Sequence, residues 1–295
     1  MRVCLCWIDR NLLKNTYLFQ NSVSKHRLGI NGINLCIRKQ LTDMTEPTSN
    51  TNHSPKPTPN NKDRPKLKIL AFHGYRQNGA LFRGKIGSFR KAVAKYAQFT
   101  FISAPHKVEC ATLPVGLADQ QVNTVIYFID ARSWWFNAED NSFSGKCLGG
   151  PAIGFQDTLE LVETVVKDHG PFDGFMGFSQ GACLVGLLAR PVFSLTHPFA
   201  IFASGFRSGS LVHKGFYDEE ITLPSLHVYG ESDSIIPKEM SESLISLYIK
   251  PVVAEHSGGH YVACSGAIKD AYQDFLHDRY QDIIEQNSTE ERRTS

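Results

Sequence analysis

A serine between two glycines is the part of this chain whose residue types and spacing point most directly to chemistry. Gly177, Ser179 and Gly181 fit G-x-S-x-G, the nucleophile elbow in which a strand turns sharply into a helix and lifts the serine hydroxyl clear of the backbone. The glycines relieve the crowding that a Cβ would cause. Apolar residues at 171–176 and 181–190 predict the flanking strand and helix. The alternative is a serine that merely begins a helix.

A serine hydroxyl attacks well only when a base takes its proton and a carboxylate orients that base. In a strand–elbow–helix fold the order along the chain is serine, acid, histidine. Asp233 and His260 follow two later apolar segments in this order. Glu231 is the alternative acid and His256 the alternative base. We favour His260, because the two glycines before it suit a tight loop that aims the imidazole back over the sheet.

An oxyanion formed at a carbonyl carbon needs two N–H donors aimed at it. The first is expected from Gln180, which follows the serine. The second is expected from the loop at 73–79, after the first strand, where Gly74 allows a bend that turns the Tyr75 N–H inward. Taken alone, this loop would equally suit a plain turn at the end of a strand.

The elements that must position these groups alternate from residue 67 onward. Six apolar segments separated by helical patterns predict an α/β fold, with a mostly parallel sheet of about six strands and helices on both faces. The carboxyl ends of parallel strands then carry the functional loops. We expect one domain at 67–286 and a disordered tail at 287–295. The predicted strands are 68–72, 99–103, 171–176, 198–203, 225–229 and 252–255.

The stretch at 106–151 is too long for a simple connection between a strand and a helix. Its dense apolar and aromatic residues, including Trp134, Trp135 and Phe136, predict an ordered lid or cap over the site. These aromatic rings could wall a substrate groove or form the core of the lid itself.

The first 66 residues differ in composition from the rest. Residues 45–66 hold five prolines and no bulky apolar side chain, which predicts a disordered linker. Residues 1–43 carry seven Lys and Arg but two Asp, so a mitochondrial transit peptide is one interpretation. We favour a dispensable extension and a cytoplasmic protein.

Composition excludes several classes of function. A formal net charge of +2 does not favour nucleic acid or an anionic membrane, and no apolar run approaches the length of a membrane span. The seven cysteines lack paired C-x-x-C spacing, which argues against a disulfide framework and a zinc site.

Four segments together resemble a known family. Residues 73–79, 177–182, 230–233 and 258–260 are similar to the small serine hydrolases first grouped in fungi, whose animal branch is the ovarian cancer-associated esterase type. Residues 132–135 resemble that family's aromatic segment, and the likeness covers about 67–284. It implies an α/β-hydrolase fold and carboxylic ester hydrolysis without cofactor or metal. The residues that fall on its triad are Ser179, Asp233 and His260, and those on its oxyanion positions are Tyr75 and Gln180.

The resemblance also implies a substrate class. Animal members are similar to hydrolases of lipid-like esters with long, unbranched acyl chains, which suits an acyl groove walled by Trp134, Trp135 and Phe136. A thioesterase acting on acyl-proteins or acyl-CoA, or a lysophospholipase, is the rival within the same chemistry. A non-catalytic binding module on a hydrolase scaffold is the rival of another class. The oligomeric state has no signal in the sequence.

Overall fold

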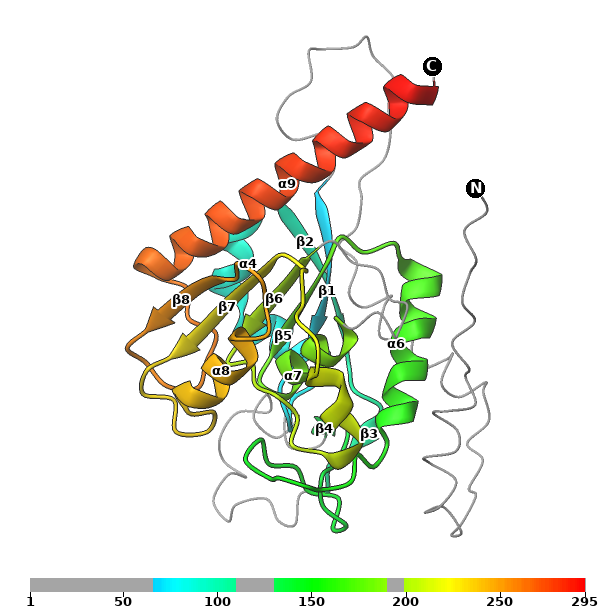
Figure 1. Cartoon of the computed structure of the whole chain (residues 1–295), viewed down its shortest axis with the longest axis vertical. Helices are drawn as coiled ribbons and strands as arrows, with labels where there is room; N and C mark the ends of the chain where they lie inside the picture. Colours follow the sequence, from blue (N-terminus) through cyan, green and yellow to red (C-terminus); the bar gives the residue numbers. More distant parts are fainter. Residues whose placement is uncertain (1–65, 110–129, 190–198, 295) are drawn as a thin grey trace, which may run out of the picture. The chain divides into compact units, whose positions relative to one another are not determined.

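The computed structural model describes residues 66–109, 130–189 and 199–294 (Figure 1), with side chains to residue 283. The predicted basic extension and linker lie outside these residues, as does the apolar run at 125–129 in the insertion.

A single six-stranded sheet forms the centre of the described chain (Figure 1). All five strand pairings are parallel, which confirms the predicted sheet. The order β2-β1-β5-β6-β7-β8 places β5, the strand before the serine, between β1 and β6. The strands are β1 (Leu67–Phe72), β2 (Ala97–Ile102), β5 (Gly174–Phe178), β6 (Phe199–Ala203), β7 (Ser225–Gly230) and β8 (Val252–His256).

Helices cover both faces of this sheet. On one face α4 (Gly87–Val93) and α9 (Gly266–Thr294) enclose a core with inward residues of the strands, and the rings of Phe89 and Tyr272 meet edge to face with centroids 4.6 Å apart. On the other face α7 (Gln180–Leu188) is buried along its whole length. It packs beside α8 (Lys238–Ile245), since Gly186 faces Leu244 and Phe202. The remaining helices are α3 (Gly79–Lys85), α6 (Phe155–His169) and the 3-10 helix η3 (Leu211–Tyr217).

Helix α9 extends past residue 286, where the sequence was expected to become a disordered tail. The structure continues the helix to Thr294. Residues 285–294 include Glu, Gln and Arg, which are good helix formers.

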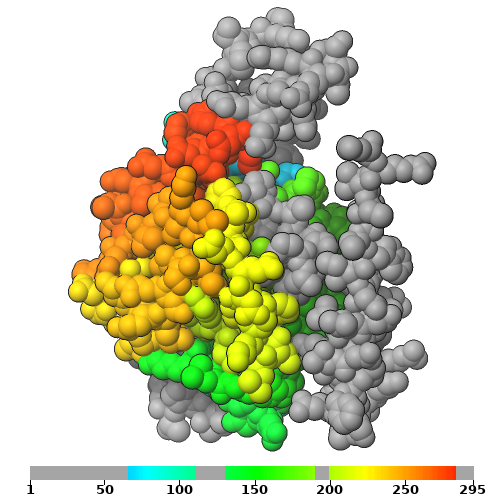
Figure 2. Space-filling model, in the orientation of Figure 1, coloured from blue at the N-terminus to red at the C-terminus, as the bar shows by residue number. Residues whose placement is uncertain are grey.

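The predicted insertion at 106–151 begins and ends on the main body. β3 (His106–Lys107) and β4 (Arg132–Ser133) pair antiparallel and so bring its two described ends together. Residues 145–150 then run beside the loop after β6, where the Gly149 N–H donates to Gly209 O (2.8 Å). Figure 2 shows the green surface of the insertion bordering the yellow surface of the segments that follow β6, on one face. Whether the insertion moves as a lid stays a prediction.

Within the described ranges, no helix combines the length and apolar character needed to cross a membrane.

Candidate active site

The backbone at Ser179 has the strained geometry that a nucleophile elbow requires. β5 ends at Phe178 and α7 begins at Gln180, so one residue makes the whole turn, with φ 53° and ψ −116°. Positive φ is costly for a residue with a Cβ and persists only where the surroundings hold it. A Cβ on Gly177 would lie 2.3 Å from Gly181 O, which explains the glycine before the serine.

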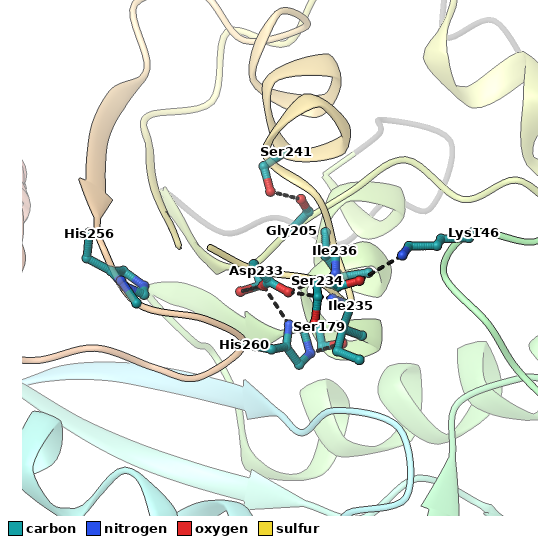
Figure 3. Close-up of polar contacts among 12 residues, drawn as sticks. Lys146, Ser179, Gly205, Asp233, Ser234, Ile235, Ile236, Ser241, His256 and His260 are labelled. Atoms are coloured by element: carbon teal, nitrogen blue, oxygen red, sulfur yellow. Dashed lines mark hydrogen bonds and ion pairs between the residues drawn. The ribbon is translucent and has the colours of Figure 1, made fainter. Parts of the chain in front are cut away.

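Ser179, His260 and Asp233 form a continuous chain of hydrogen bonds (Figure 3). The His260 Nε2 lies 2.9 Å from the Ser179 Oγ, and its Nδ1 lies 2.7 Å from the Asp233 Oδ2. Because the carboxylate only accepts, Nδ1 carries the proton and Nε2 is left to accept from the serine hydroxyl. The structure therefore brings together the three residues predicted from spacing.

The Asp233 carboxylate is buried and its two oxygens have different partners. Oδ1 accepts from the backbone N–H groups of Ile235 and Ile236, both at 2.9 Å. Oδ2 accepts from the Ser204 hydroxyl (3.0 Å) as well as from His260. Such donors stabilise the charged form of a buried carboxylate. Sequence reasoning missed Ser204, whose only signal was its place just after β6.

The alternative acid and base are placed elsewhere. Glu231 is exposed, whereas Asp233 is buried against the histidine. His256 lies at the end of β8, where its Nδ1 accepts from the Gly258 N–H (3.2 Å). Burial lowers the pKa of His256, although Asp233 and Glu255 oppose the shift. Figure 3 shows its ring apart from the chain that joins the serine to the acid.

The loop after β1 lies directly against the nucleophile. A Cβ on Gly74 would sit 3.4 Å from the Ser179 Cβ and 2.9 Å from the Phe178 ring, so only glycine fits there without displacing the elbow. The Gly74 carbonyl accepts from the Gln77 N–H (3.1 Å) and from the His73 Nδ1 (2.8 Å). This closes a tight turn with Tyr75 at its tip.

His73 is buried and neutral at physiological pH. Its Nε2 accepts from the Ala104 N–H (2.9 Å), which leaves the proton on Nδ1 for Gly74 O. Burial lowers its pKa to about 4, and the nearby Arg132 adds to the shift.

The tryptophans lie in the interior and do not wall an open groove. Trp134 and Trp135 are both 0% exposed and Phe136 is 5% exposed, so their predicted place on a substrate-binding surface is wrong. Trp134 packs on Phe72 and His73, with centroids 5.4 and 4.9 Å away. Trp134 is held against the loop after β1, where its Nε1–H donates to the His73 carbonyl, whereas the Trp135 ring packs on those of Phe155 and His213.

Phe143 is an aromatic residue of the insertion that contacts the loop after β1. It is half-buried and its ring meets those of Tyr75 (5.4 Å) and Phe206 (6.4 Å). Two residues further on, a Cβ on Gly145 would lie 2.6 Å from Ile236, beside the acid loop. The Lys146 ammonium donates to the Ser234 carbonyl (2.7 Å; Figure 3). The insertion therefore spans from the Tyr75 loop to the Asp233 loop, and no sequence signal marked Phe143.

This geometry agrees with comparison to known proteins. Residues 63–272 match the family model described as "Serine hydrolase (FSH1)". The chain belongs to the FSH1 serine hydrolase family. Membership makes it an α/β-hydrolase and an enzyme of the carboxylic ester hydrolase class, as the sequence predicted.

Curated relatives of this FSH1 hydrolase carry the name esterase. It is 48% identical over 227 residues to "Esterase CG5412" of Drosophila melanogaster, covering 75% of this chain and 77% of the relative. It is 42% identical over 220 residues to "Esterase OVCA2" of Danio rerio, covering 71% and 96%. "Esterase C25G4.2" of Caenorhabditis elegans is 36% identical over 232 residues, covering 76% and 99%.

Proposed function

We propose that this FSH1 serine hydrolase is a carboxylesterase that works through an acyl-enzyme on Ser179. The observation that carries the proposal is the unbroken chain from the Ser179 hydroxyl through His260 to Asp233, at 2.9 and 2.7 Å. The first distance allows proton transfer from the serine hydroxyl to His260 without rearrangement, and the second lets Asp233 hold the imidazole in place.

In the first half of the reaction the Ser179 Oγ attacks the ester carbonyl carbon while His260 Nε2 takes the hydroxyl proton. Asp233 holds the imidazole in the correct tautomer and stabilises its cation. The carbonyl oxygen becomes negative and accepts from the N–H groups of Gln180 and Tyr75. Collapse of this intermediate breaks the ester C–O bond, and His260 returns its proton to the departing alcohol.

In the second half, water attacks the acyl-enzyme carbonyl and His260 takes a proton from it. Collapse then releases the carboxylic acid and regenerates the Ser179 hydroxyl. Gln180 suits its role because it is the first residue of α7, where a helical N–H has no intrahelical acceptor. These steps use only groups of the chain and water.

We further propose a lipid-like ester with an unbranched acyl chain as the substrate. The half-buried rings of Tyr75 and Phe143, whose centroids lie 5.4 Å apart, support this, because they offer aromatic contact beside one of the proposed oxyanion donors.

The test compares purified wild-type protein with Ser179→Ala on nitrophenyl esters of increasing acyl length. Turnover by the variant is expected to fall about 10⁶-fold, and a fluorophosphonate should label only the wild type. A variant that keeps near wild-type turnover would refute the mechanism. Absent labelling of folded wild type would favour the binding module, and preference for a matched thioester would favour the thioesterase.

A further inference from the structure

The two proposed oxyanion donors lie on separate parts of the fold, yet both must aim at one point. Tyr75 follows β1, whereas Gln180 begins α7. Donors stabilise an oxyanion only when their positions are fixed before the charge develops. The contacts that hold both segments therefore affect turnover even where they never touch substrate.

Trp134 touches the supports of both donors. Its indole Nε1–H donates to the His73 carbonyl (2.8 Å), and its backbone N–H donates to the Gln180 side-chain Oε1 (3.1 Å). The Trp134 carbonyl in turn accepts from the Thr158 hydroxyl on α6. Every one of these groups is fully buried.

On the Tyr75 side, the effect passes through one peptide plane. His73 Nδ1–H donates to Gly74 O, which belongs to the same peptide unit as the Tyr75 N–H. The C=O and N–H of a trans peptide point in opposite directions. Fixing Gly74 O therefore fixes the direction of the Tyr75 N–H, and Trp134 fixes the backbone from which the His73 ring projects.

On the Gln180 side, the side-chain amide is fully engaged with the same segment. Its Nε2 donates to the Trp135 carbonyl (2.7 Å) and to the Ser133 Oγ (3.1 Å). Its Oε1 accepts from the Trp134 N–H, while Ser133 donates its single hydroxyl proton to the Trp135 carbonyl (2.6 Å). Gln180 is thus tied to β4 and to the two residues that follow it, rather than held by the helix alone.

We propose that Trp134 is a positioning residue that holds the two oxyanion donors, Tyr75 and Gln180, at their working separation by bonding to His73 and to the Gln180 amide. The proposal rests on the proposed esterase function. It gives the part of the insertion just after β4 a role in stabilising the oxyanion, without any contact between that part and the substrate.

The chain offers a matched control in the neighbouring residue. Trp135 is equally buried, but its Nε1 has no hydrogen-bond partner within the described structure, and only its carbonyl meets Gln180. Trp134→Phe and Trp135→Phe therefore remove the same atoms from the same kind of environment. They differ because Trp134→Phe removes an existing hydrogen bond, from the indole N–H to the His73 carbonyl, whereas Trp135→Phe removes none.

The experiment measures kcat, KM and affinity for an alkylboronic acid, whose tetrahedral adduct with a serine hydroxyl places an oxygen where the oxyanion forms. For Trp134→Phe we expect kcat and boronic acid affinity to fall together, about 3- to 10-fold, with KM unchanged. For Trp135→Phe we expect both within about twofold of wild type. The melting temperature should fall further for Trp134→Phe than for Trp135→Phe, because the first variant takes the indole donor from the buried His73 carbonyl.

Equal effects of the two variants on kcat and on boronic acid affinity would overturn the proposal, because loss of packing would then explain both. So would a rise in KM as the sole effect of Trp134→Phe. If Trp134→Phe does not fold, Gln180→Met keeps the backbone donor but removes the amide, and it should show the same paired loss. A wild-type protein without esterase turnover would refute the proposed function instead.

Discussion

Replacing Asp233 by asparagine tests the roles within the proposed triad, because the surrounding donors dictate how the new amide must lie. The Oδ1 position faces two backbone N–H groups, from Ile235 and Ile236, so the amide oxygen must occupy it. The reverse orientation would bury an NH₂ group against two donors, at about 1–3 kcal/mol for each unsatisfied group.

The NH₂ group of the introduced asparagine therefore takes the place of the Asp233 Oδ2, 2.7 Å from His260 Nδ1. A donor there forces Nδ1 to accept, so the imidazole proton moves to Nε2. That N–H then points at the Ser179 Oγ, 2.9 Å away, and the histidine can no longer take the serine proton. The loss should be about 10⁴-fold in kcat, or roughly 5 kcal/mol of transition-state stabilisation.

The assay is steady-state hydrolysis of a nitrophenyl ester, with fluorophosphonate labelling as a second readout and thermal unfolding as a check on folding. Glu231→Gln is the matched control, since it makes the same chemical change two residues away at an exposed side chain. It should retain wild-type turnover. If Asp233→Asn kept more than about a tenth of wild-type kcat, the tautomer argument would be wrong. An equal loss of turnover in Glu231→Gln would show that Asp233 alone is not the acid of the triad.

Two further predictions concern stability. Gly177→Ala should lose both folding stability and turnover, because the added Cβ would meet backbone atoms at 2.3 and 2.4 Å. Gly84→Ala on α3, where nothing lies within 4 Å of the added Cβ, should instead gain about 0.5–1 kcal/mol of stability from helix propensity. Urea unfolding of both variants checks this, and equal effects would contradict it. Burial lowers the pKa of four histidines below the 6.5 expected when unfolded: to about 4 for His73, to about 3 for His213 and His227, and in the same direction for His256. Above pH 6.5 these histidines are neutral in both the folded and the unfolded chain, so their neutral form costs no stability. As the pH falls from 6.5 through about 4, His73, His213 and His227 take up protons in the unfolded chain but not in the folded one. The free energy of unfolding should therefore fall by about 1.4 kcal/mol per pH unit for each of these three histidines. His227→Gln should reduce that slope by up to the share of one histidine, about 1.4 kcal/mol per pH unit, in urea titrations at pH 7, 6 and 5, and an unchanged slope would contradict the assignment.

The sequence predicted the triad because topology constrains it. In a parallel sheet the loops after β5, β7 and β8 all emerge at one edge, so Ser179, Asp233 and His260 could be paired from their order alone. The glycines of the elbow could also be predicted, because backbone segments that approach each other so closely leave no room for a Cβ.

Other parts of the site depend on packing that no local pattern encodes. Ser204 reaches Asp233 across two neighbouring strand ends, and a serine after a strand has many other uses. Trp134 and Phe143 both belong to an aromatic-rich insertion, and only the path of the backbone decides that one is 0% exposed and the other is half-buried against Tyr75. Aromatic composition could not separate these two outcomes.

The close approach of backbone around the elbow has a consequence for protein engineering. A Cβ on Gly181 would lie 2.2 Å from Phe72 O and 2.6 Å from His73 O, so α7 rests on β1 with no side chain between them. The segment that carries the nucleophile is thus closely packed backbone, while the half-buried Phe143 stands on a separate loop. Libraries that vary the loop around Phe143 should leave Ser179 in place, whereas random substitution at the elbow should yield inactive protein.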